Sequence, residues 1–308
     1  MAEIFLKTLP FFLLIGLGYW AGRTRFFSAE ATAYLTKFVF YFALSAMLFR
    51  FSSNLRLEEL ADWPFILAYL SATMVVYLFV TALSLLRGRP VAEAAFEAQC
   101  GVIGNVGFLG IPMLVLLLGP EAIGPVVMVL AVDLIVFGSL IVIIVSASRG
   151  TFSWGILPKV AIGLVKNPMI VSITLGLLWS AFALPIPGPM AEFLQILGAA
   201  ATPGALFAIG ASLATKSAER LTTAVELSAV KLLLHPAAVS VAALLVFQVE
   251  TYAAGVMIAA ASLPVAGNVY ILAQHYGIAP QRVSATILIS TAASIFTISA
   301  MIALVTAL

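Results

Sequence analysis

Long apolar stretches follow one another along almost the whole chain, and each is long enough to cross a membrane as a helix. A helix rises about 1.5 Å per residue, so about 20 residues span the roughly 30 Å hydrocarbon core of a bilayer. The strands of an outer-membrane barrel would instead alternate in polarity over segments of about ten residues. The sequence therefore predicts an all-α membrane protein with ten transmembrane helices, over about residues 4–22, 30–49, 63–86, 93–118, 121–146, 160–182, 190–214, 225–247, 252–276 and 282–306.

The composition agrees with this class of protein and excludes several others. Hydrophobic residues make up 63% of the chain and charged residues only 9%, with a mean hydropathy of +1.16. A soluble globular domain carries about 25% charged residues, so a cytosolic enzyme and a nucleic-acid-binding protein are both excluded. A single cysteine, Cys100, allows no intrachain disulfide and no cysteine-based metal cluster. The sequence also holds no P-loop and no HExxH motif, so we expect no catalytic residue, cofactor or metal.

The loop charges predict how the chain is oriented in the membrane. Cytoplasmic loops of membrane proteins carry an excess of Lys and Arg. If the N-terminus lies outside, the outer loops hold three basic residues, Lys7, Arg50 and Arg56, whereas the loops on the other side hold ten. We therefore expect a multi-pass protein of the plasma (inner) membrane with both termini outside. The ten residues assigned to the cytoplasmic side are Arg23, Arg25, Arg87, Arg89, Arg149, Lys159, Lys166, Lys216, Arg220 and Arg282.

A weak internal repeat relates the two halves of the chain. Residues of the first two predicted helices recur 158 residues later, and a Gly-Asn-Val sequence recurs at a slightly larger spacing. Each half holds five predicted helices, an odd number, so the second half must enter the membrane from the opposite side. Residues 1–150 and 151–308 are therefore predicted to form an inverted repeat, an arrangement found in many secondary transporters. The matching pairs are Pro10/Pro168, Ile15/Ile173, Leu17/Leu175, Gly18/Gly176, Ala43/Ala201, Leu48/Leu206, Phe49/Phe207, Gly104/Gly267, Asn105/Asn268 and Val106/Val269.

The fourth and ninth predicted helices are interrupted near their centres. Residues 100–112 contain four glycines and one proline, and residues 263–268 contain one of each. Glycine adds backbone freedom and proline removes a hydrogen-bond donor, so both disfavour a continuous helix. Unwound backbone near the bilayer midplane is tolerated only where protein or a watery cavity satisfies it, and paired interruptions indicate a transporter's substrate site. The residues expected to break the helices are Gly101, Gly107, Pro112 and Pro264.

Each break leaves the N-terminus of a half-helix near the midplane. The free N–H groups and partial positive charge of such an end suit an anion, for example a carboxylate. Asn105 and Asn268 lie inside the two breaks, where each amide can donate and accept hydrogen bonds without introducing a charge. The alternative is a kinked helix in which each asparagine satisfies its own frayed backbone. The residues predicted to bind substrate at the breaks are Gly104, Asn105, Val106, Gly267, Asn268, Val269 and Tyr270.

Four polar residues inside the predicted helices are candidates for ion coupling, namely Asp133, Lys231, His235 and Gln274. A charge near the bilayer centre costs about 2.5–3.5 kcal/mol on insertion scales, so Asp133 is expected to face a cavity or a partner. The alternatives for Asp133 are a proton-coupling carboxylate, an organiser of the crossing helices, or a cap for the N–H groups of a broken helix. Lys231 and His235 lie on one face of a helix. The alternatives to ion coupling are that Lys231 extends to the cytoplasmic surface and that His235 makes a hydrogen bond to a neighbouring helix. Gln274 either lines the site or makes a packing hydrogen bond.

These segments resemble the auxin efflux carrier (AEC) family, which includes plant PIN carriers and bacterial malonate-carrier-like proteins. The resembling segments are GNVGFLGIP (104–112), TPGALFAIGASLA (202–214) and KLLLHP (231–236), with further similarity over 271–277 and 284–294. The resemblance implies two crossing broken helices in a fold similar to that of bile-acid sodium symporters. It also implies a scaffold of helices 1, 2, 6 and 7, a transport domain of helices 3–5 and 8–10, and organic anions as substrates.

One departure from the family pattern lies on the scaffold side of the expected pocket. The family usually has a proline in the second helix where this chain has Ser45, although the repeat partner Pro203 is present. Ser45 is therefore included among the expected substrate-site residues, with a local geometry that differs from the family pattern.

We therefore expect a secondary transporter or facilitator, not an enzyme, that moves small organic anions by alternating access. The substrates would be auxin-like carboxylates or dicarboxylates, carried by an elevator-type movement with proton or sodium coupling. One alternative is a sodium-coupled symporter of the same fold, and another is a non-transporting membrane receptor. The expected partners are the anionic substrate and the lipid bilayer, with no nucleic acid, and an exposed scaffold face would allow a homodimer.

Overall fold

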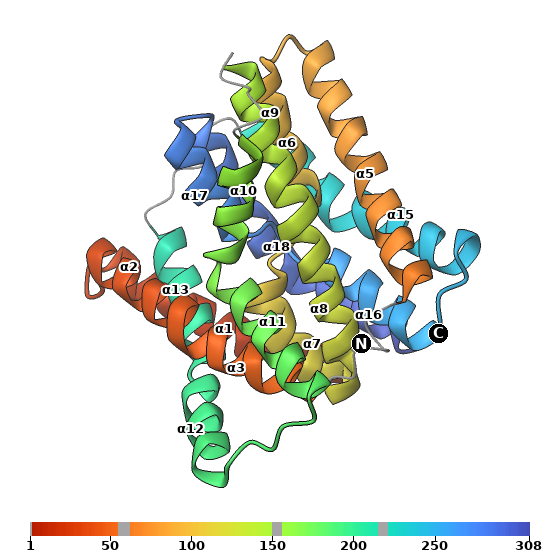
Figure 1. Ribbon diagram of the computed structural model, residues 1–308. Helices are drawn as coiled ribbons and strands as arrows, with labels where there is room; N and C mark the ends of the chain where they lie inside the picture. Colours follow the sequence, from red (N-terminus) through yellow and green to blue (C-terminus); the bar gives the residue numbers. More distant parts are fainter. Residues whose placement is uncertain (1, 55–61, 150–155, 215–220) are drawn as a thin grey trace.

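The computed structural model describes residues 2–54, 62–149, 156–214 and 221–308 (Figure 1). Helices account for nearly all of these residues, and the strand-like pairing found among them is an isolated antiparallel bridge between Gly104 and Val265. The all-α class predicted from the sequence is therefore confirmed. The α-helices are α1 (Ala2–Arg23), α2 (Ala29–Phe38), α3 (Leu44–Ser52), α5 (Trp63–Leu86), α6 (Val91–Val102), α7 (Ile111–Leu118), α8 (Ile123–Val132), α9 (Gly138–Ser148), α10 (Ile156–Val165), α11 (Pro168–Ala181), α12 (Gly188–Ala199), α13 (Ala201–Leu213), α14 (Leu221–Ala229), α15 (His235–Ser240), α16 (Thr251–Ala261), α17 (Gly267–Tyr276) and α18 (Pro280–Val305).

Several of these helices continue into one another through wide π-type turns. α2 joins α3 through Val39–Ala43, α8 joins α9 through Asp133–Phe137, and α14 joins α15 through Val230–Leu234. A π-type turn holds more residues than an α-helical turn, and such turns are frequent at functional sites. Two of the predicted coupling residues, Asp133 and Lys231, lie within these turns.

Six helical segments in the described part of the chain are long and apolar enough to cross a membrane, and three shorter apolar helices accompany them. This finding supports the predicted polytopic membrane protein, whereas the number of ten spans remains a prediction. The six segments are Ala29–Ser52, Trp63–Leu86, Pro120–Ser148, Gly188–Leu213, Leu221–Val246 and Pro280–Val305, and the shorter helices are Val106–Leu118, Pro168–Ala181 and Thr251–Ala261.

Two pairs of helices pack at backbone contact, α1 against α13 and α3 against α11. A Cβ atom at Gly18 in α1 would lie 2.1 Å from the Phe207 carbonyl oxygen in α13. A Cβ atom at Gly176 in α11 would lie 2.7 Å from the Phe49 carbonyl oxygen in α3. Only glycine permits so close an approach, and small residues are the usual means of tight helix packing in membranes. Both the glycines and the phenylalanines are partners in the sequence repeat, so one contact reproduces the other with the two halves exchanged.

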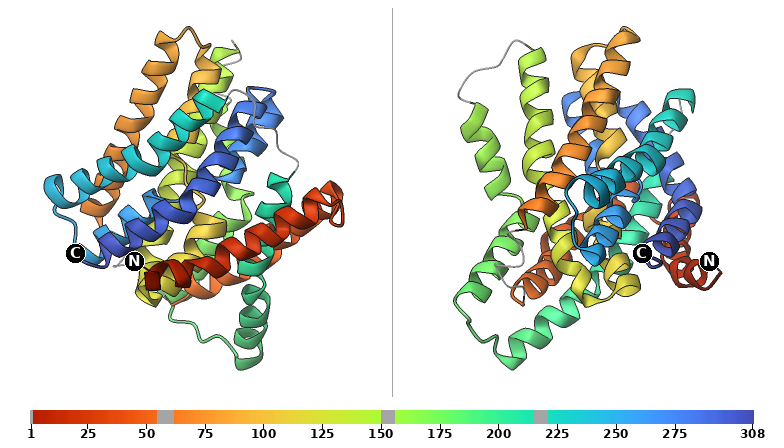
Figure 2. Two further views of the ribbon diagram at one scale, coloured as in Figure 1. Left: turned by 180° about the vertical axis from the view of Figure 1, so that it is seen from behind. Right: turned by 90° about the vertical axis from the view of Figure 1, so that its right-hand side faces the viewer.

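The two chain ends lie near one another on the same side of the molecule (Figures 1 and 2). α1 and α18 meet there, and the buried hydroxyl groups of Thr8 and Ser299 share a hydrogen bond of 2.9 Å. The interior is formed largely by the interrupted helices, because every side chain from Ala94 to Val102 in α6 and from Ala254 to Ala261 in α16 is buried. The breaks that follow these two helices are therefore held inside the protein.

Candidate functional site

The two interrupted helices meet at their breaks. α6 ends at Val102 and α16 ends at Ala261, and each is followed by a short non-helical segment. The N–H of Asn105 donates to the Pro264 carbonyl oxygen at 2.8 Å, and the N–H of Ala266 donates to the Ile103 carbonyl oxygen at 3.1 Å. The two segments therefore pair with each other and satisfy backbone groups that a helix would otherwise satisfy. We call this pairing the crossing.

Small and polar residues make the crossing fit its surroundings. A Cβ atom at Gly104 would lie 3.3 Å from the Ala260 carbonyl oxygen and 3.4 Å from the Lys231 Nζ atom, so a side chain there would crowd the pairing. On the other segment, the Val265 N–H donates to the Ser290 hydroxyl oxygen of α18 at 3.2 Å. This bond supplies a partner for a backbone donor that cannot be solvated in the membrane interior.

A buried lysine lies against one of the helix ends at the crossing. The Nζ atom of Lys231, which is completely buried, donates to the carbonyl oxygen of Ala261 at 2.5 Å. Ala261 is the last residue of α16, and the C-terminal end of a helix carries a partial negative charge. The ammonium group thus occupies the position where that end best accommodates a cation.

His235 connects Lys231 to Thr73 of α5. Lys231 Nζ lies 3.2 Å from His235 Nδ1, and His235 Nε2 lies 3.0 Å from the Thr73 hydroxyl oxygen. A protonated Lys231 can only donate, so the neutral imidazole that fits both distances accepts at Nδ1 and carries its proton on Nε2, toward Thr73. The predicted alternative in which Lys231 extends to the cytoplasmic surface does not match this geometry.

Asp133 lies close to the same group of side chains. The Tyr69 hydroxyl donates to Asp133 Oδ1 at 2.9 Å, and the Tyr69 ring lies 6.0 Å from the His235 ring. Oδ2 is buried and has no hydrogen-bond partner among the described residues. Asp133 therefore adds an ionisable group, opposite in charge to Lys231, to the buried cluster of Lys231, His235, Thr73 and Tyr69. Asp133 is 5% exposed, so it faces protein rather than lipid, and its partner is a tyrosine rather than the N–H groups of a half-helix.

The two asparagines of the repeat have different environments. Asn105 is 6% exposed, and its neighbours Gly104 and Val106 are also buried. Gly267 and Asn268, in the first turn of α17, are exposed, and no atom lies within 4 Å of the place that a Cβ atom at Gly267 would take. The crossing is therefore exposed at the first turn of α17 and buried around Asn105.

The face of α17 that begins at Asn268 stays exposed to the end of the helix. Ile271 and Gln274 lie on this face, three residues apart and one turn apart, and both are exposed. Val269 is buried on the opposite face, and Tyr270 is partly buried. Gln274 is therefore separate from the buried cluster around Lys231.

The remaining predicted residues lie around the first break. Gly101 is within the last turn of α6, so the helix breaks only after it, and Pro112 lies inside the helical stretch Val106–Leu118, directly after the π-type turn Val106–Gly110. A Cβ atom at Gly107 would lie 2.5 Å from the Met169 Cε atom of α11. Ser45 is partly buried and donates to the Phe40 carbonyl oxygen in its own helical segment at 3.2 Å.

Two residues of the cluster, Tyr69 and Thr73, were not predicted from the sequence. They lie four residues apart on one face of α5 and link Asp133 to His235. Polar groups at helical spacing within a very apolar span are a usable signal, although a tyrosine and a threonine also occur as ordinary core residues.

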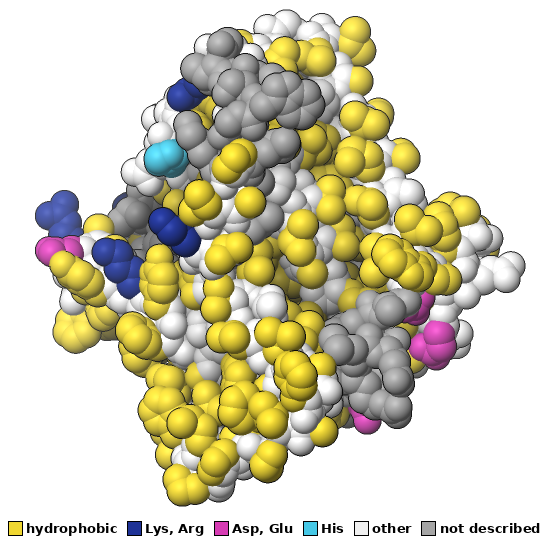
Figure 3. Space-filling model, viewed as in Figure 1, with side chains coloured by type: hydrophobic (Ala, Val, Ile, Leu, Met, Phe, Trp, Pro, Cys, Tyr) yellow, Lys and Arg dark blue, Asp and Glu magenta, His cyan; other side chains and the backbone are white. Residues whose placement is uncertain are grey.

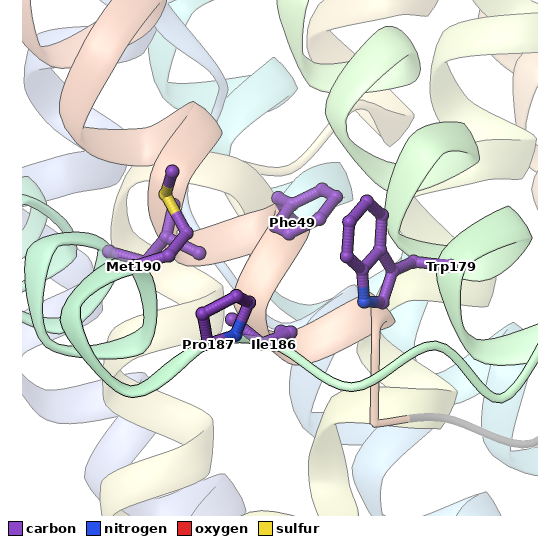
Figure 4. Close-up of a pocket in the computed structure, with 6 residues that line it drawn as sticks. Phe49, Trp179, Ile186, Pro187 and Met190 are labelled. Carbon is purple, nitrogen blue, oxygen red and sulfur yellow. The ribbon is translucent and has the colours of Figure 1, made fainter.

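A separate pocket lies between α3, α11 and the start of α12 (Figure 4). Its volume is about 300 Å³, and its walls are Phe49, Trp179, Ile186, Pro187, Met190 and Leu194. Figure 4 shows the Phe49 and Trp179 rings side by side, with centroids 5.9 Å apart. No residue of the crossing lines this pocket, and it offers no charged group to an anion.

The structure combines apolar spans, two helices interrupted in the protein interior, and buried ionisable groups where these two helices meet. Together these features define a membrane protein of the transporter class. Comparison with known proteins agrees. A family model described as "Membrane transport protein" matches residues 3–153 and 144–302. A protein of Rhizobium meliloti (strain 1021) named "Putative malonate transporter" is 33% identical over 311 residues, covering 99% of this chain and 97% of the relative. The chain belongs to the auxin efflux carrier family of membrane transport proteins.

Proposed function

We propose that this protein is a secondary carrier of small organic anions, and that the anion binds at the crossing beside Asn268. The observation that carries the proposal is the placement of the Lys231 ammonium group on the carbonyl end of α16, the helix that leads through the second break into the exposed first turn of α17. A half-helix N-terminus offers free N–H groups and roughly half a unit of positive charge. Gly267 and Asn268 lie at that N-terminus and are exposed, so a carboxylate can reach it.

The charge balance at the crossing favours coupling to protons. When Asp133 is ionised, its carboxylate offsets the charge of Lys231, and the crossing attracts an anion only weakly. When Asp133 takes up a proton, the ammonium group is left uncompensated in a region of low dielectric, where a bound carboxylate is strongly stabilised. The unpartnered Oδ2 atom is free to hold that proton. Anion binding and protonation of Asp133 therefore support each other.

The same contact argues against the sodium-coupled alternative. A sodium ion near the crossing would need backbone carbonyl oxygens as ligands, and the Ala261 carbonyl is already bonded to Lys231. Gln274, the other candidate for a cation site, lies on the exposed face of α17. A resident ammonium group thus stands where a symporter of this kind would hold its cation, and we propose sodium-independent transport.

For the architecture we propose ten helices in two inverted halves, residues 1–150 and 151–308. The exchanged contacts of Gly18 with Phe207 and of Gly176 with Phe49 support a two-fold relation between the halves. Both chain ends lie on one side of the molecule, as an even number of spans requires (Figure 2). The tight packing of α1 with α13 and of α3 with α11 fits a rigid scaffold, against which the helices around the crossing move as in an elevator.

The proposed orientation is in the plasma membrane with both termini outside. On the face shown in Figure 3, Lys and Arg side chains gather at the upper left and most Asp and Glu side chains at the lower right, with apolar side chains between them. A gathering of Lys and Arg on one side is typical of the cytoplasmic side of a membrane protein.

The substrate class is best tested first with malonate, because the name of the Rhizobium meliloti relative includes this dicarboxylate. Purified protein is titrated with malonate and with small monocarboxylates and indole acids, with and without sodium, and its thermal unfolding is followed. A bound ligand raises the unfolding temperature. We expect a rise with at least one carboxylate that does not depend on sodium and is absent in Asn268→Ala.

Gln195→Ala is the matched control, because Gln195 is an exposed amide on α12, outside the crossing. It should respond to the ligand as the unaltered protein does. A rise that persists in Asn268→Ala would contradict the proposed site, and a rise that requires sodium would favour the symporter.

A further inference from the structure

A second group of charged side chains is buried away from the crossing, between α6 and α18. Arg282 is 5% exposed and Glu97 is 3% exposed. The NH1 group of Arg282 donates to Glu97 Oε1 at 2.5 Å and to Glu93 Oε2 at 3.0 Å. Ser84 donates to the other oxygen of Glu97, and Arg89 Nε lies 3.8 Å from Oε1. The group is a network rather than a single pair.

Arg282 occupies an electrostatically unfavourable position in its own helix. It is the third residue of α18, and the first turn of a helix carries a partial positive charge that disfavours a cation. Burial adds the cost of removing the guanidinium group from water. Both costs are offset by Glu97 and Glu93 of α6, so it is the contact with α6 that accounts for a buried arginine at this position.

The contact between Arg282 and Glu97 closes a ring of interactions through the crossing. From Glu97, α6 leads to Gly104, which pairs with Val265 of the other break. Val265 donates its N–H to Ser290 of α18. Ser290 lies eight residues after Arg282, just over two turns along the same face of that helix. α6 and α18 are therefore linked twice, once through the ion pair and once through the crossing.

We propose that Arg282 and Glu97 are positioning residues, which hold the two paired segments of the crossing in register by fixing α6 against α18. Neither side chain reaches the crossing itself, so the effect is transmitted through the helices. The consequence for anion binding rests on the proposed function, whereas the effect on the crossing does not.

Hydrogen–deuterium exchange of the full-length protein in detergent or nanodiscs tests the proposal without any ligand. In Glu97→Gln and in Arg282→Gln, peptides covering residues 103–106 and 263–266 should exchange at least about tenfold faster, because the paired amides open more often. Peptides from α1 and α13 should keep the exchange rates of the unaltered protein. Unchanged exchange at the crossing, or an equal increase along the whole chain, would overturn the proposal.

Two further variants separate positioning from general destabilisation. Arg87→Gln is the matched control, because it breaks the exposed ion pair with Glu226 and should leave exchange at the crossing unchanged. Arg282→Lys keeps a cation between Glu97 and Glu93, so it tests whether the ion pair itself holds α6 against α18. It should keep exchange at the crossing within about threefold of the original rate, and exchange as fast as in Arg282→Gln would refute a role for the ion pair itself.

Malonate binding in the same variants completes the test. If the exchange results are as expected but neither the original protein nor any variant binds a carboxylate, the proposed function fails and the positioning role stands. If the original protein binds malonate, and Arg282→Gln binds it equally well despite faster hydrogen exchange at the crossing, the register of the crossing does not control anion binding.

Discussion

The ammonium group of Lys231 lies 2.5 Å from the carbonyl oxygen of Ala261, completely buried in the protein. Ala261 ends α16, so this contact places a positive charge on the negative end of a half-helix at the crossing. A buried charge needs compensation, and here the helix end and His235 both contact the ammonium group. The proposed anion site depends on this charge.

Removal of the lysine charge should destabilise the protein more than removal of both opposite charges. Lys231→Met leaves the Asp133 carboxylate buried without its counter-charge, and we expect a loss of about 3–5 kcal/mol in the free energy of unfolding. The double variant with Asp133→Asn should recover at least about 1 kcal/mol of this loss. Reversible unfolding in mixed micelles measures both values. Losses that simply add would show that the two residues do not interact.

Because the helices of the proposed scaffold are closely packed, we expect even a glycine-to-alanine substitution to lower the stability of the protein. Gly18→Ala inserts a methyl group where only 2.1 Å separates it from the Phe207 carbonyl oxygen, so α1 must move away from α13. We expect a loss of about 1–3 kcal/mol for Gly18→Ala, and a comparable loss for its repeat partner Gly176→Ala.

The control for these variants is Gly16→Ala in the same helix, since no atom lies within 4 Å of its added methyl group. It should leave stability unchanged or raise it slightly, because alanine favours a helix more than glycine does. Equal unfolding temperatures for Gly16→Ala and Gly18→Ala would contradict the packing described above.

Because one face of α17 is exposed, we expect water to reach some positions near the crossing and not others. The sole cysteine of the sequence, Cys100, is buried, so it adds little background to thiol labelling. Asn268→Cys and Gln274→Cys should react with a membrane-impermeant maleimide at least about tenfold faster than Asn105→Cys, the buried repeat partner of Asn268.

The side from which the reagent acts tests the proposed orientation as well. Labelling should occur from the cytoplasmic side in membrane vesicles. Equal rates at positions 105 and 268 would mean that the two breaks are equally accessible, contrary to the structure. Labelling from the outer side alone would reverse the orientation.

The helical class and the two breaks could be predicted because their signals are local. Apolar stretches of membrane-spanning length and the glycines and prolines near Asn105 and Asn268 can each be recognised within a few residues of sequence. The repeat also identified Gly18 and Gly176 as partners, and the structure then gave both the same kind of contact.

The interactions that join distant segments could not be predicted. Glu97 and Arg282 are separated by 185 residues, and in the sequence each looks like a charge near the end of a helix. The different exposure of Asn105 and Asn268 depends on how the surrounding helices are arranged, so a symmetric sequence pattern gives no indication of it. Tyr69 resembles a core aromatic residue until its hydroxyl group is seen to bond Asp133.

Proton coupling through Asp133 predicts a specific change in pH dependence. In proteoliposomes, an inward proton gradient should accelerate malonate uptake by the unaltered protein, because protonation of Asp133 strengthens anion binding. Asp133→Asn mimics the protonated form, so it should still exchange malonate across the membrane but no longer respond to the gradient. Uptake by Asp133→Asn that still follows the proton gradient would exclude Asp133 as the coupling group.

Counterflow of labelled malonate tests the central claim most directly, namely that a carboxylate crosses the membrane by binding at the crossing, where the charge of Lys231 stabilises it. Proteoliposomes loaded with unlabelled malonate are placed in sodium-free buffer, and the entry of labelled malonate is followed for the unaltered protein, Lys231→Met and Gln195→Ala. We predict saturable counterflow for the unaltered protein and Gln195→Ala, and a decrease of at least about 100-fold for Lys231→Met, which corresponds to about 2.7 kcal/mol. Equal counterflow in Lys231→Met, or no saturable counterflow of malonate or any small monocarboxylate by the unaltered protein, would contradict the claim.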